Sequence, residues 1–484
     1  MPTIQLEQYI GGRWAPGEGG PVRSENPARP EEIVAAGSGA SSGDLDRAVV
    51  AARAAQRDWA ATPTHERGAV LQRAAALIRD SAEQHGAELA REEGKTLAEG
   101  IGEVRRAAQI LDYAGQAGDR EAGSVFDSPR PGERILVTRH ALGTVGLITP
   151  FNFPIAIPAW KVAPALAYGN AVVWKPADPV PLLAMRLAEA LHRAGLPNGV
   201  LNLVIGDAQI GRALVAHPGI DAVSFTGSTA VGRSIASSGA ARGIPVQAEL
   251  GGKNAAVVLA DADLELAAAQ VAAGAFGSSG QKCTATSRLV VAEEIADEFM
   301  ALVAARADQL VVGDPLADGV GLGPVISASA RARIDRGVAD ALSCGARRMT
   351  SGRLDLDAEL TSGHFVRPEV IDCTGVDSEL WNRELFGPVL AVRRAADVNE
   401  AFGLANEGEF GLSAAIFTDD LSTALSAIDQ VEVGMLHLNS ETAGADPHVP
   451  FGGAKGSGLG PQEQGAAARD FYTRSTTVYL RGGS

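Results

Sequence analysis

The sequence predicts an α/β protein with two doubly wound parallel-sheet domains and a small additional β segment. Short apolar runs alternate with helical patterns along most of the chain, which is typical of parallel strands covered by helices on both faces. The chain has 484 residues, too many for one compact core, so more than one domain is expected. Its 57 glycines supply the many tight turns that this alternation needs.

The first 120 residues are mostly helical after a short β start. Residues 9–14 predict a strand and a turn. Leu45 and Val49 begin a series of apolar residues at helical spacing, which predicts a helix over 42–61 with Ser42 as its cap. Further helices are expected at about 66–83, 84–94 and 97–120.

A ribbon outside the core is expected next. The stretch 126–133 is rich in proline and glycine, and 134–140 has the pattern of a strand. The final strand, 475–480, is of the same kind. Such edges lie outside a core and need a partner, so these segments predict a surface hairpin or a contact with another chain.

The remaining chain shows the strand–helix alternation most clearly. Apolar strands are expected at 145–149, 171–176, 201–204 and 222–225, with helices between them. The pattern resumes beyond Gly252 with strands at 255–259, 288–291 and 369–371. We infer a second α/β domain over about 252–437.

Composition restricts the possible partners and the compartment. The formal charge is −16 and no run of basic residues stands out, which argues against nucleic acid as a partner. No apolar run approaches the ~20 residues of a membrane span. The three cysteines lie far apart without a CxxC pair, so neither a disulfide framework nor a metal site is predicted. A reducing, cytoplasmic location is expected.

Three stretches carry groups that can do chemistry together. Cys283 lies in a polar loop, 280–285, that can present a thiol, and Glu249 precedes a glycine pair. Asn152 lies between two phenylalanines and two prolines. Each residue alone has an ordinary explanation, such as a buried thiol or a turn amide. Together, a thiol, a carboxylate and an amide can form a thiohemiacetal, stabilise its oxyanion and hydrolyse a thioester.

These stretches and their neighbours resemble the aldehyde dehydrogenase superfamily along nearly the whole chain. The branch most similar in its motifs is the α-ketoglutaric semialdehyde (2,5-dioxopentanoate) dehydrogenases. The runs that carry this similarity are 151–161, 176–178, 448–453 and 460–465. One departure is Lys282, where that branch commonly has arginine.

The resemblance implies the catalytic roles. Cys283 would be the nucleophile, and the Asn152 amide and the Cys283 backbone N–H would hold the oxyanion. Glu249 would activate the water that releases the acid. Because relatives that transfer the acyl group to coenzyme A lack this glutamate, Glu249 favours hydrolysis to a free acid.

The resemblance also implies a nicotinamide cofactor, NAD with NADP possible. Lys175 and Asp178 would contact the adenosine ribose, and Asp178 would repel a 2′-phosphate. Glu384 would hold the nicotinamide ribose. On its own, the turn after 222–225 would be interpreted as an ordinary strand–helix connection, and the nearby Lys175 and Asp178 favour a cofactor site instead. The other implied cofactor-binding residues are Ile148, Thr149, Pro150, Gly211, Phe225, Thr226, Gly227, Ser228, Val231, Leu250, Gly251 and Phe386.

The substrate is predicted to be a small aldehyde, with 2,5-dioxopentanoate favoured. Phe153, Trp160 and Phe451 match positions that line the substrate tunnel of the family, and Lys282 and Thr284 flank the thiol. A broad, aromatic-aldehyde or succinic semialdehyde dehydrogenase is an alternative. An acyl-transferring enzyme and a catalytically silent cofactor-binding protein are the others.

By the same resemblance the chain divides into domains and forms a homodimer or homotetramer. Residues 1–125 and 146–251 would bind NAD(P), and 252–437 would carry the thiol. The segments 126–145 and 457–484 would form the oligomerisation segment, and 438–456 would return to the cofactor domain.

Overall fold

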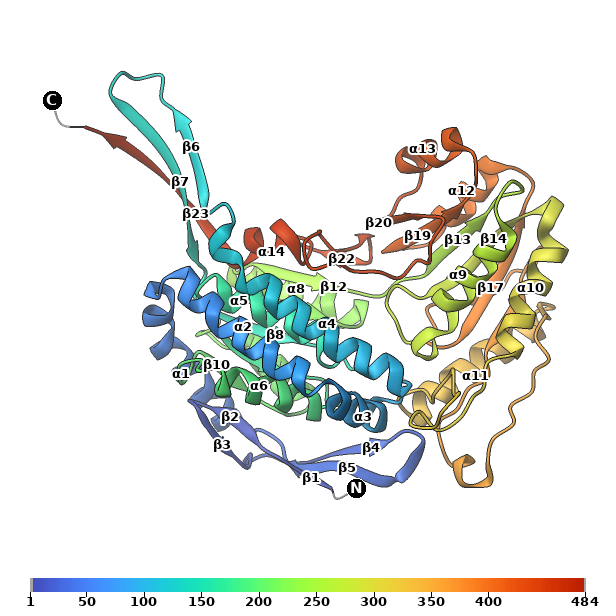
Figure 1. The fold of residues 1–484 in the computed structure, drawn as a ribbon, viewed down its shortest axis with the longest axis horizontal. Helices are drawn as coiled ribbons and strands as arrows, with labels where there is room; N and C mark the ends of the chain where they lie inside the picture. The colour runs from blue at the N-terminus through green and yellow to red at the C-terminus, as the bar shows by residue number, and fades with distance from the viewer. Residues whose placement is uncertain (1–2, 483–484) are drawn as a thin grey trace.

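The computed structural model of the protein describes residues 3–482, and in this part of the chain two large sheets form separate lobes (Figure 1). Sheet I has the strand order β22 (Gly458–Leu459), β12 (Val246–Glu249), β11 (Ala222–Thr226), β8 (Thr144–Ile148), β9 (Ala171–Lys175), β10 (Leu201–Leu203), β2 (Gln8–Ile10), β3 (Arg13–Ala15). Sheet II has the order β15 (Arg347–Arg348), β16 (Glu369–Asp372), β17 (Val389–Ala395), β14 (Thr286–Ala292), β13 (Asn254–Val258), β19 (Ser413–Phe417), β20 (Met435–Leu438). The predicted α/β fold with two parallel-sheet units is confirmed.

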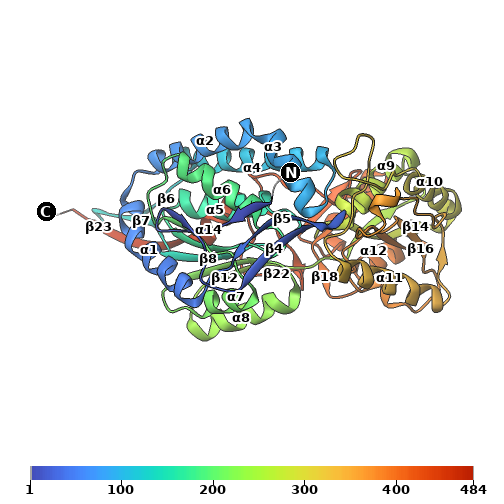
Figure 2. The ribbon, with the colours of Figure 1, turned by 90° about the horizontal axis from the view of Figure 1, so that it is seen from below.

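Sheet I is parallel from β12 through β10, and helices cover both of its faces (Figure 2). Its central strands β8, β9 and β11 are buried almost throughout and rich in apolar residues such as valine, as expected for strands covered on both sides. One face is covered by α2 (Thr64–Asp80), α3 (Ala82–Glu93), α4 (Leu97–Gly115), α5 (Ala156–Ala167) and α6 (Leu182–Arg193). The other face is covered by α1 (Ser42–Ala61), α7 (Ala208–Ala216) and α8 (Thr229–Arg242).

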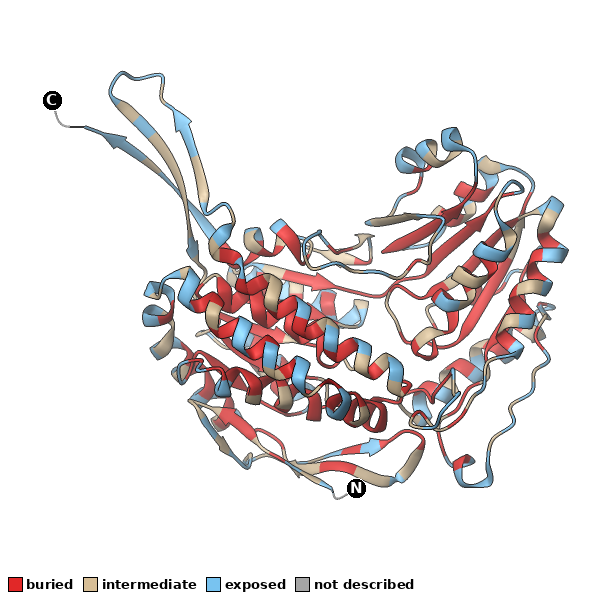
Figure 3. Ribbon diagram, in the orientation of Figure 1, coloured by how far each residue is buried: buried red, intermediate tan, exposed pale blue. Residues whose placement is uncertain are grey.

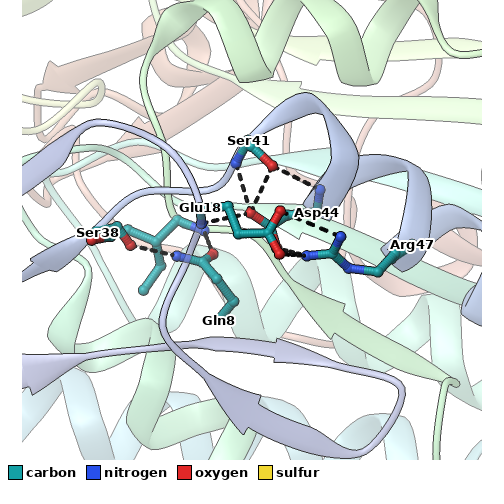
Figure 4. A network of polar contacts seen from close by, with 7 residues as sticks. Gln8, Glu18, Ser38, Ser41, Asp44 and Arg47 are labelled. Carbon is teal, nitrogen blue, oxygen red and sulfur yellow. Dashed lines mark hydrogen bonds and ion pairs between the residues drawn. The ribbon is translucent and has the colours of Figure 1, made fainter.

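The start of α1 corrects one expectation from the sequence (Figure 4). The cap is Ser41, not Ser42: its backbone is extended, at φ −87° and ψ 172°, and its hydroxyl accepts the Asp44 N–H. Asp44 in turn accepts the backbone N–H of Ser41 at 2.8 Å and of Glu18 at 2.9 Å. Capping depends on which serine has non-helical backbone angles, and a Ser-Ser pair does not reveal this.

Sheet II is parallel except for β15, and its strands are mostly buried apart from the edge strands β15 and β20. Its helices are α9 (Leu264–Phe276) and α10 (Ala296–Asp308) on one face, and α11 (Ala328–Ser343), α12 (Val398–Asn406) and α13 (Leu421–Gln430) on the other. Two small sheets lie outside these layers. One has the order β1 (Ile4–Leu6), β5 (Arg29–Ser38), β4 (Pro21–Asn26), and the other is the pair β18 (Phe410–Gly411) and β21 (Ala454–Lys455).

A third unit projects away from both lobes as an arm. It consists of β6 (Gly123–Asp127), β7 (Glu133–Ala141) and β23 (Thr473–Arg481), and most of it is exposed (Figure 3). The expected two-stranded ribbon is therefore three-stranded. Of the residues 457–484 assigned to this segment, β22 pairs with β12 of sheet I and α14 (Gly465–Tyr472) packs on α5, so only β23 belongs to the arm. Among the described helices, none is long and apolar enough to cross a membrane.

The two large sheets meet end to end. Glu249 is the last residue of β12 in sheet I, and Asn254 is the first residue of β13 in sheet II. Cys283 lies just before β14, at the amino end of the strands of sheet II. Carboxyl ends of parallel strands are where doubly wound sheets bind ligands. The thiol therefore faces the ligand-binding edge of sheet I.

Candidate active site

Cys283 follows a loop with unusual backbone angles. Ser278 and Ser279 have φ values of +53° and +54°, in the left-handed region that residues with a Cβ rarely adopt. The Cys283 carbonyl oxygen accepts the side-chain amide of Asn254 at 2.8 Å. A Cβ on Gly252 would lie 2.5 Å from that same oxygen, so the turn after Glu249 packs directly on the thiol loop. Strain of this kind concentrates at functional sites.

The Cys283 thiol is strongly disfavoured as a thiolate in the isolated protein. Burial is the largest effect and, with the negative charges of Glu249 and Glu384, raises the pKa of Cys283 to about 12. The backbone N–H of Thr284 opposes this shift. A thiol reacts as the thiolate, so a positive charge must arrive beside it before it becomes a good nucleophile.

Glu249 is buried, with only 4% of its surface exposed. Burial raises its pKa well above the usual range, and the nearby charge of Glu463 raises it further, whereas Lys161 lowers it. The backbone N–H of Gly453 bonds to the carboxyl group, and its Oε2 has no hydrogen-bond partner within residues 3–482. A carboxyl group with a raised pKa and one free oxygen has the character of a general base.

A buried polar network lies behind Glu249. Lys161 forms an ion pair with Glu463 and donates to the Ser224 hydroxyl at 2.8 Å. Ser224 also lies 2.9 Å from the side-chain oxygen of Gln247. Lys161 and Glu463 are 302 positions apart in the chain. Both residues lie in runs that resemble the aldehyde dehydrogenases, 151–161 and 460–465, but no role was predicted for them from the sequence.

The loop around Asn152 is held by an aromatic contact. Asn152 is buried, and its neighbour Phe151 packs edge to face against Phe386, with ring centroids 5.7 Å apart. This contact places the Asn152 loop beside the loop that carries Glu384. Of the predicted tunnel residues, Trp160 and Phe451 are in contact, at 5.1 Å between centroids. The side chain of Lys282, in contrast, lies against α9: its Nζ is 3.4 Å from the Ala273 carbonyl oxygen and 3.8 Å from the Glu441 carboxylate.

A groove of about 590 Å³ opens between α7 and α8. Five predicted cofactor residues line it: Ile148, Lys175, Gly211, Phe225 and Val231. It lies at the carboxyl ends of β8, β9 and β11, and β8 and β11 are the neighbours at which the strand order reverses. This is the switch point where doubly wound sheets bind nucleotides.

The donors beside this groove suit a dinucleotide. Ser228 precedes α8 without capping it through its side chain, so the first N–H groups of the helix are free for an anion such as a pyrophosphate. The Thr226 hydroxyl is buried without a partner within residues 3–482. A Cβ on Gly227 would lie 2.6 Å from the Phe225 ring, which explains the glycine. The residues present therefore fit the implied cofactor.

The second predicted cofactor contact lies at Glu384. Burial raises the pKa of this carboxyl group to about 7, and the Gly252 N–H donates to it at 3.1 Å. A side chain at Gly251 would collide with it. Phe386 has a φ of +54°, again in the left-handed region.

Ten of the predicted cofactor residues do not line this groove, and two of these, Thr149 and Leu250, have other contacts. Thr149 accepts the indole N–H of Trp174 at 2.9 Å. Leu250 packs against Gly232 in the core of sheet I. Pro150 follows Thr149 just beyond the carboxyl end of β8.

A family model described as the aldehyde dehydrogenase family matches residues 14–478. The chain belongs to the aldehyde dehydrogenase family. The α-ketoglutaric semialdehyde dehydrogenase of Bacillus subtilis (strain 168) is 40% identical over 479 residues, 98% of this chain and 97% of that protein. Malonate-semialdehyde dehydrogenase 1 of Geobacillus thermodenitrificans is 36% identical over 482 residues, 98% of each chain. The crystal structure of betaine aldehyde dehydrogenase from Staphylococcus aureus in complex with NAD⁺ has a TM-score of 0.94 at 30% identity, covering 99% of this chain and 95% of that one.

The structure of this aldehyde dehydrogenase also shows polar residues that sequence reasoning missed. Asn254 holds the backbone of Cys283 and lies only five positions after Glu249, in a motif that was noticed for its glycines. Lys95 contacts the Asn152 loop from the turn between the helices predicted at 84–94 and 97–120. A lysine and an acidic run between two helices could have signalled a buried ion pair.

Proposed function

We propose that this aldehyde dehydrogenase oxidises a short semialdehyde to the free carboxylic acid, with 2,5-dioxopentanoate as its favoured substrate. The observation that carries the reaction type is the buried Glu249, with its raised pKa and free oxygen, acting electrostatically on Cys283. The substrate rests on the 40% identity to an α-ketoglutaric semialdehyde dehydrogenase over nearly the whole chain.

The reaction begins at Cys283. Its Sγ, after losing the thiol proton to solvent, attacks the carbonyl carbon and converts the C=O oxygen into an oxyanion. The Asn152 amide and the Cys283 backbone N–H donate to that oxygen. A nicotinamide cofactor held at the groove by Lys175 and by Glu384 would supply the acceptor for the hydride of the former aldehyde carbon, and its positive charge would favour the thiolate. The two-electron oxidation leaves a thioester on Cys283.

Glu249 carries the second half of the reaction. Its carboxylate takes a proton from water while the water oxygen adds to the thioester carbon. The C–S bond then breaks, which releases the carboxylic acid and returns the Cys283 thiol. The raised pKa of Glu249 makes it a stronger base than an exposed carboxylate, and this favours hydrolysis over transfer to coenzyme A.

Two buried donors lie beside the residues predicted to line the substrate tunnel. The Trp160 indole N–H and the side-chain amide of Gln464 are buried and lack hydrogen-bond partners within residues 3–482. Both line the same small cavity, and the Trp160 ring also contacts Phe451. Unpaired buried donors are costly, but this cavity of about 20 Å³ has room for about one water molecule rather than for a substrate group.

The proposal includes NAD as cofactor, a homo-oligomer and a cytoplasmic location. Asp178 forms an ion pair with Lys175 at the groove, where its charge would oppose a 2′-phosphate. The arm exposes apolar side chains, among them Phe126 and Tyr479, that a second copy of the chain would cover. The three free cysteines suit a reducing compartment.

The test is cofactor reduction, followed by absorbance, with 2,5-dioxopentanoate, malonate semialdehyde, succinic semialdehyde and benzaldehyde. We expect the highest kcat/KM with 2,5-dioxopentanoate, total loss in Cys283→Ala and no change in Cys344→Ala, whose thiol is exposed. A preference for malonate semialdehyde or benzaldehyde would contradict the substrate but keep the mechanism. Full activity of Cys283→Ala would contradict the mechanism. A requirement for coenzyme A would contradict the hydrolytic step.

A further inference from the structure

Lys95 is a buried lysine, 2% exposed, in the turn between α3 and α4. Its ammonium group contacts Glu103 Oε2 at 2.7 Å, the Asn152 carbonyl oxygen, and the face of the Phe153 ring at 3.6 Å from the centroid. A lysine has three N–H donors, and each has one partner here. Two of the three partners belong to the loop that carries the proposed oxyanion donor.

Glu103 extends this contact to the start of α5. Its second oxygen, Oε1, accepts the backbone N–H groups of Ile155 at 3.0 Å and Ala156 at 3.2 Å. The cap residue of α5, Ile155, provides no side-chain cap of its own. The Glu103 carboxylate, from α4, therefore caps the N-terminus of α5 and interacts favourably with the positive end of that helix dipole.

Glu99, one turn away on α4, reaches the thiol loop. It closes a capping box with Thr96, and its Oε1 accepts the backbone N–H of Ser278 at 2.6 Å. Ser278 is one of the two residues with left-handed backbone angles before Cys283. One end of α4 thus bonds to the Asn152 loop on sheet I and to the Cys283 loop on sheet II.

We propose that Lys95, Glu103 and Glu99 are positioning residues that fix the Asn152 amide relative to the Cys283 thiol across the two lobes. The inference rests on the proposed roles of Asn152 and Cys283. None of the three is a catalytic residue in this account, because each acts through backbone atoms of a loop. Their effect is geometric, since an oxyanion donor displaced by about 1 Å can cost on the order of 100-fold in rate.

A double-mutant cycle in the full-length enzyme tests this inference. Asn152→Ala alone should lower kcat by about 100- to 1,000-fold. Lys95→Met alone should lower kcat by about 10- to 100-fold with little change in the Kd for NAD. In the Asn152→Ala background, Lys95→Met should change kcat less than about 3-fold, because the group it positions is already gone. The same factor in both backgrounds would overturn the proposal, since a general loss of structure is independent of Asn152.

Three further variants keep the test decisive. Glu103→Gln retains an acceptor for Ile155 and Ala156 but weakens the hold on Lys95, so it should show the same non-additivity even if Lys95→Met does not fold. Glu99→Ala should also lower kcat and should lose most of this effect in the Asn152→Ala background, because it fixes the thiol loop relative to the same amide. Asp112→Asn removes an exposed ion pair of the same helix with Arg79 and should leave kcat unchanged.

The two proposals fail in different ways. Wild-type kcat in Asn152→Ala would contradict the role of Asn152 in the proposed function, whatever Lys95 does. A large loss in Asn152→Ala combined with full additivity of Lys95→Met and of Glu103→Gln would contradict the positioning role alone. Unchanged kcat in Glu99→Ala would show that Glu99 does not position the thiol loop.

Discussion

The charges around Cys283 disfavour the thiolate form of its side chain as long as no cofactor is bound. Burial and the carboxylates of Glu249 and Glu384 raise the pKa of the thiol to about 12. The isolated protein therefore holds its nucleophile in the protonated form, which resists oxidation and alkylation. Glu249 has a raised pKa itself, so acid formation should increase with pH as this carboxyl group loses its proton.

The first prediction concerns Glu249→Gln and distinguishes two functions of a base, deprotonation of the water and deprotonation of the Cys283 thiol. Removing the negative charge lowers the pKa of Cys283, so iodoacetamide should alkylate the cofactor-free thiol faster at a given alkaline pH. Steady-state acid production should fall by about 100- to 10,000-fold, because the water has lost its base. Both measurements use a Cys344→Ala background to silence the exposed thiol. Slower alkylation would mean that Glu249 also takes the thiol proton.

At the scale of elements, the cofactor groove is a product of strand order. The chain adds β9 and β10 on one side of β8 and then returns to place β11 on the other side. The two loops that leave β8 and β11 must therefore diverge, and the groove lies where they separate. Lys175 lines this groove because it ends β9, the next strand, and Asp178, three positions later, forms an ion pair with it.

The second prediction concerns cofactor choice at this edge. Asp178→Asn removes the charge that opposes a 2′-phosphate, so the ratio of kcat/KM for NADP to that for NAD should rise about 10-fold, equivalent to about 1.4 kcal/mol. Glu189→Gln is the matched control, because this carboxylate on α6 has a similar side-chain exposure, 45% against 43%. An unchanged ratio in Asp178→Asn would show that the aspartate does not face the ribose.

At the scale of the whole molecule, the arm stands apart from a well-buried body. Each lobe has apolar clusters on both faces of its sheet, whereas the arm presents exposed Val125, Phe126, Tyr479 and Leu480. A three-stranded sheet without a covered face buries little apolar surface by itself. Contact with a second copy would supply the missing burial.

The third prediction follows from this exposed apolar surface. The double substitution Phe126→Lys and Tyr479→Lys should lower the mass measured by light scattering toward that of a single chain. Leu421→Lys, on the exposed side of α13, changes a residue of comparable exposure outside the arm and should leave the mass unchanged. A loss of mass only in Leu421→Lys would place the contact between copies on α13.

The sequence by itself determined the parts of this protein that depend on neighbours in the chain. Strands such as β9 and β11 are runs of apolar residues, and α1 follows from helical spacing, so their positions were predicted within a few residues. The thiol, the carboxylate and the amide were found because each lies in a distinctive short motif. The groove was predicted in part, through Lys175 and Gly211, by resemblance to a known family.

Only the tertiary structure decided which distant groups support these motifs. Lys95 meets Asn152 across 57 positions, and Lys161 meets Glu463 across 302, because separate elements pack against one another. No local pattern encodes such a meeting: a buried lysine and an exposed one have similar sequence surroundings. The raised pKa values of Cys283 and Glu249 have the same origin, since burial and the sum of nearby charges exist only once the two lobes have folded together.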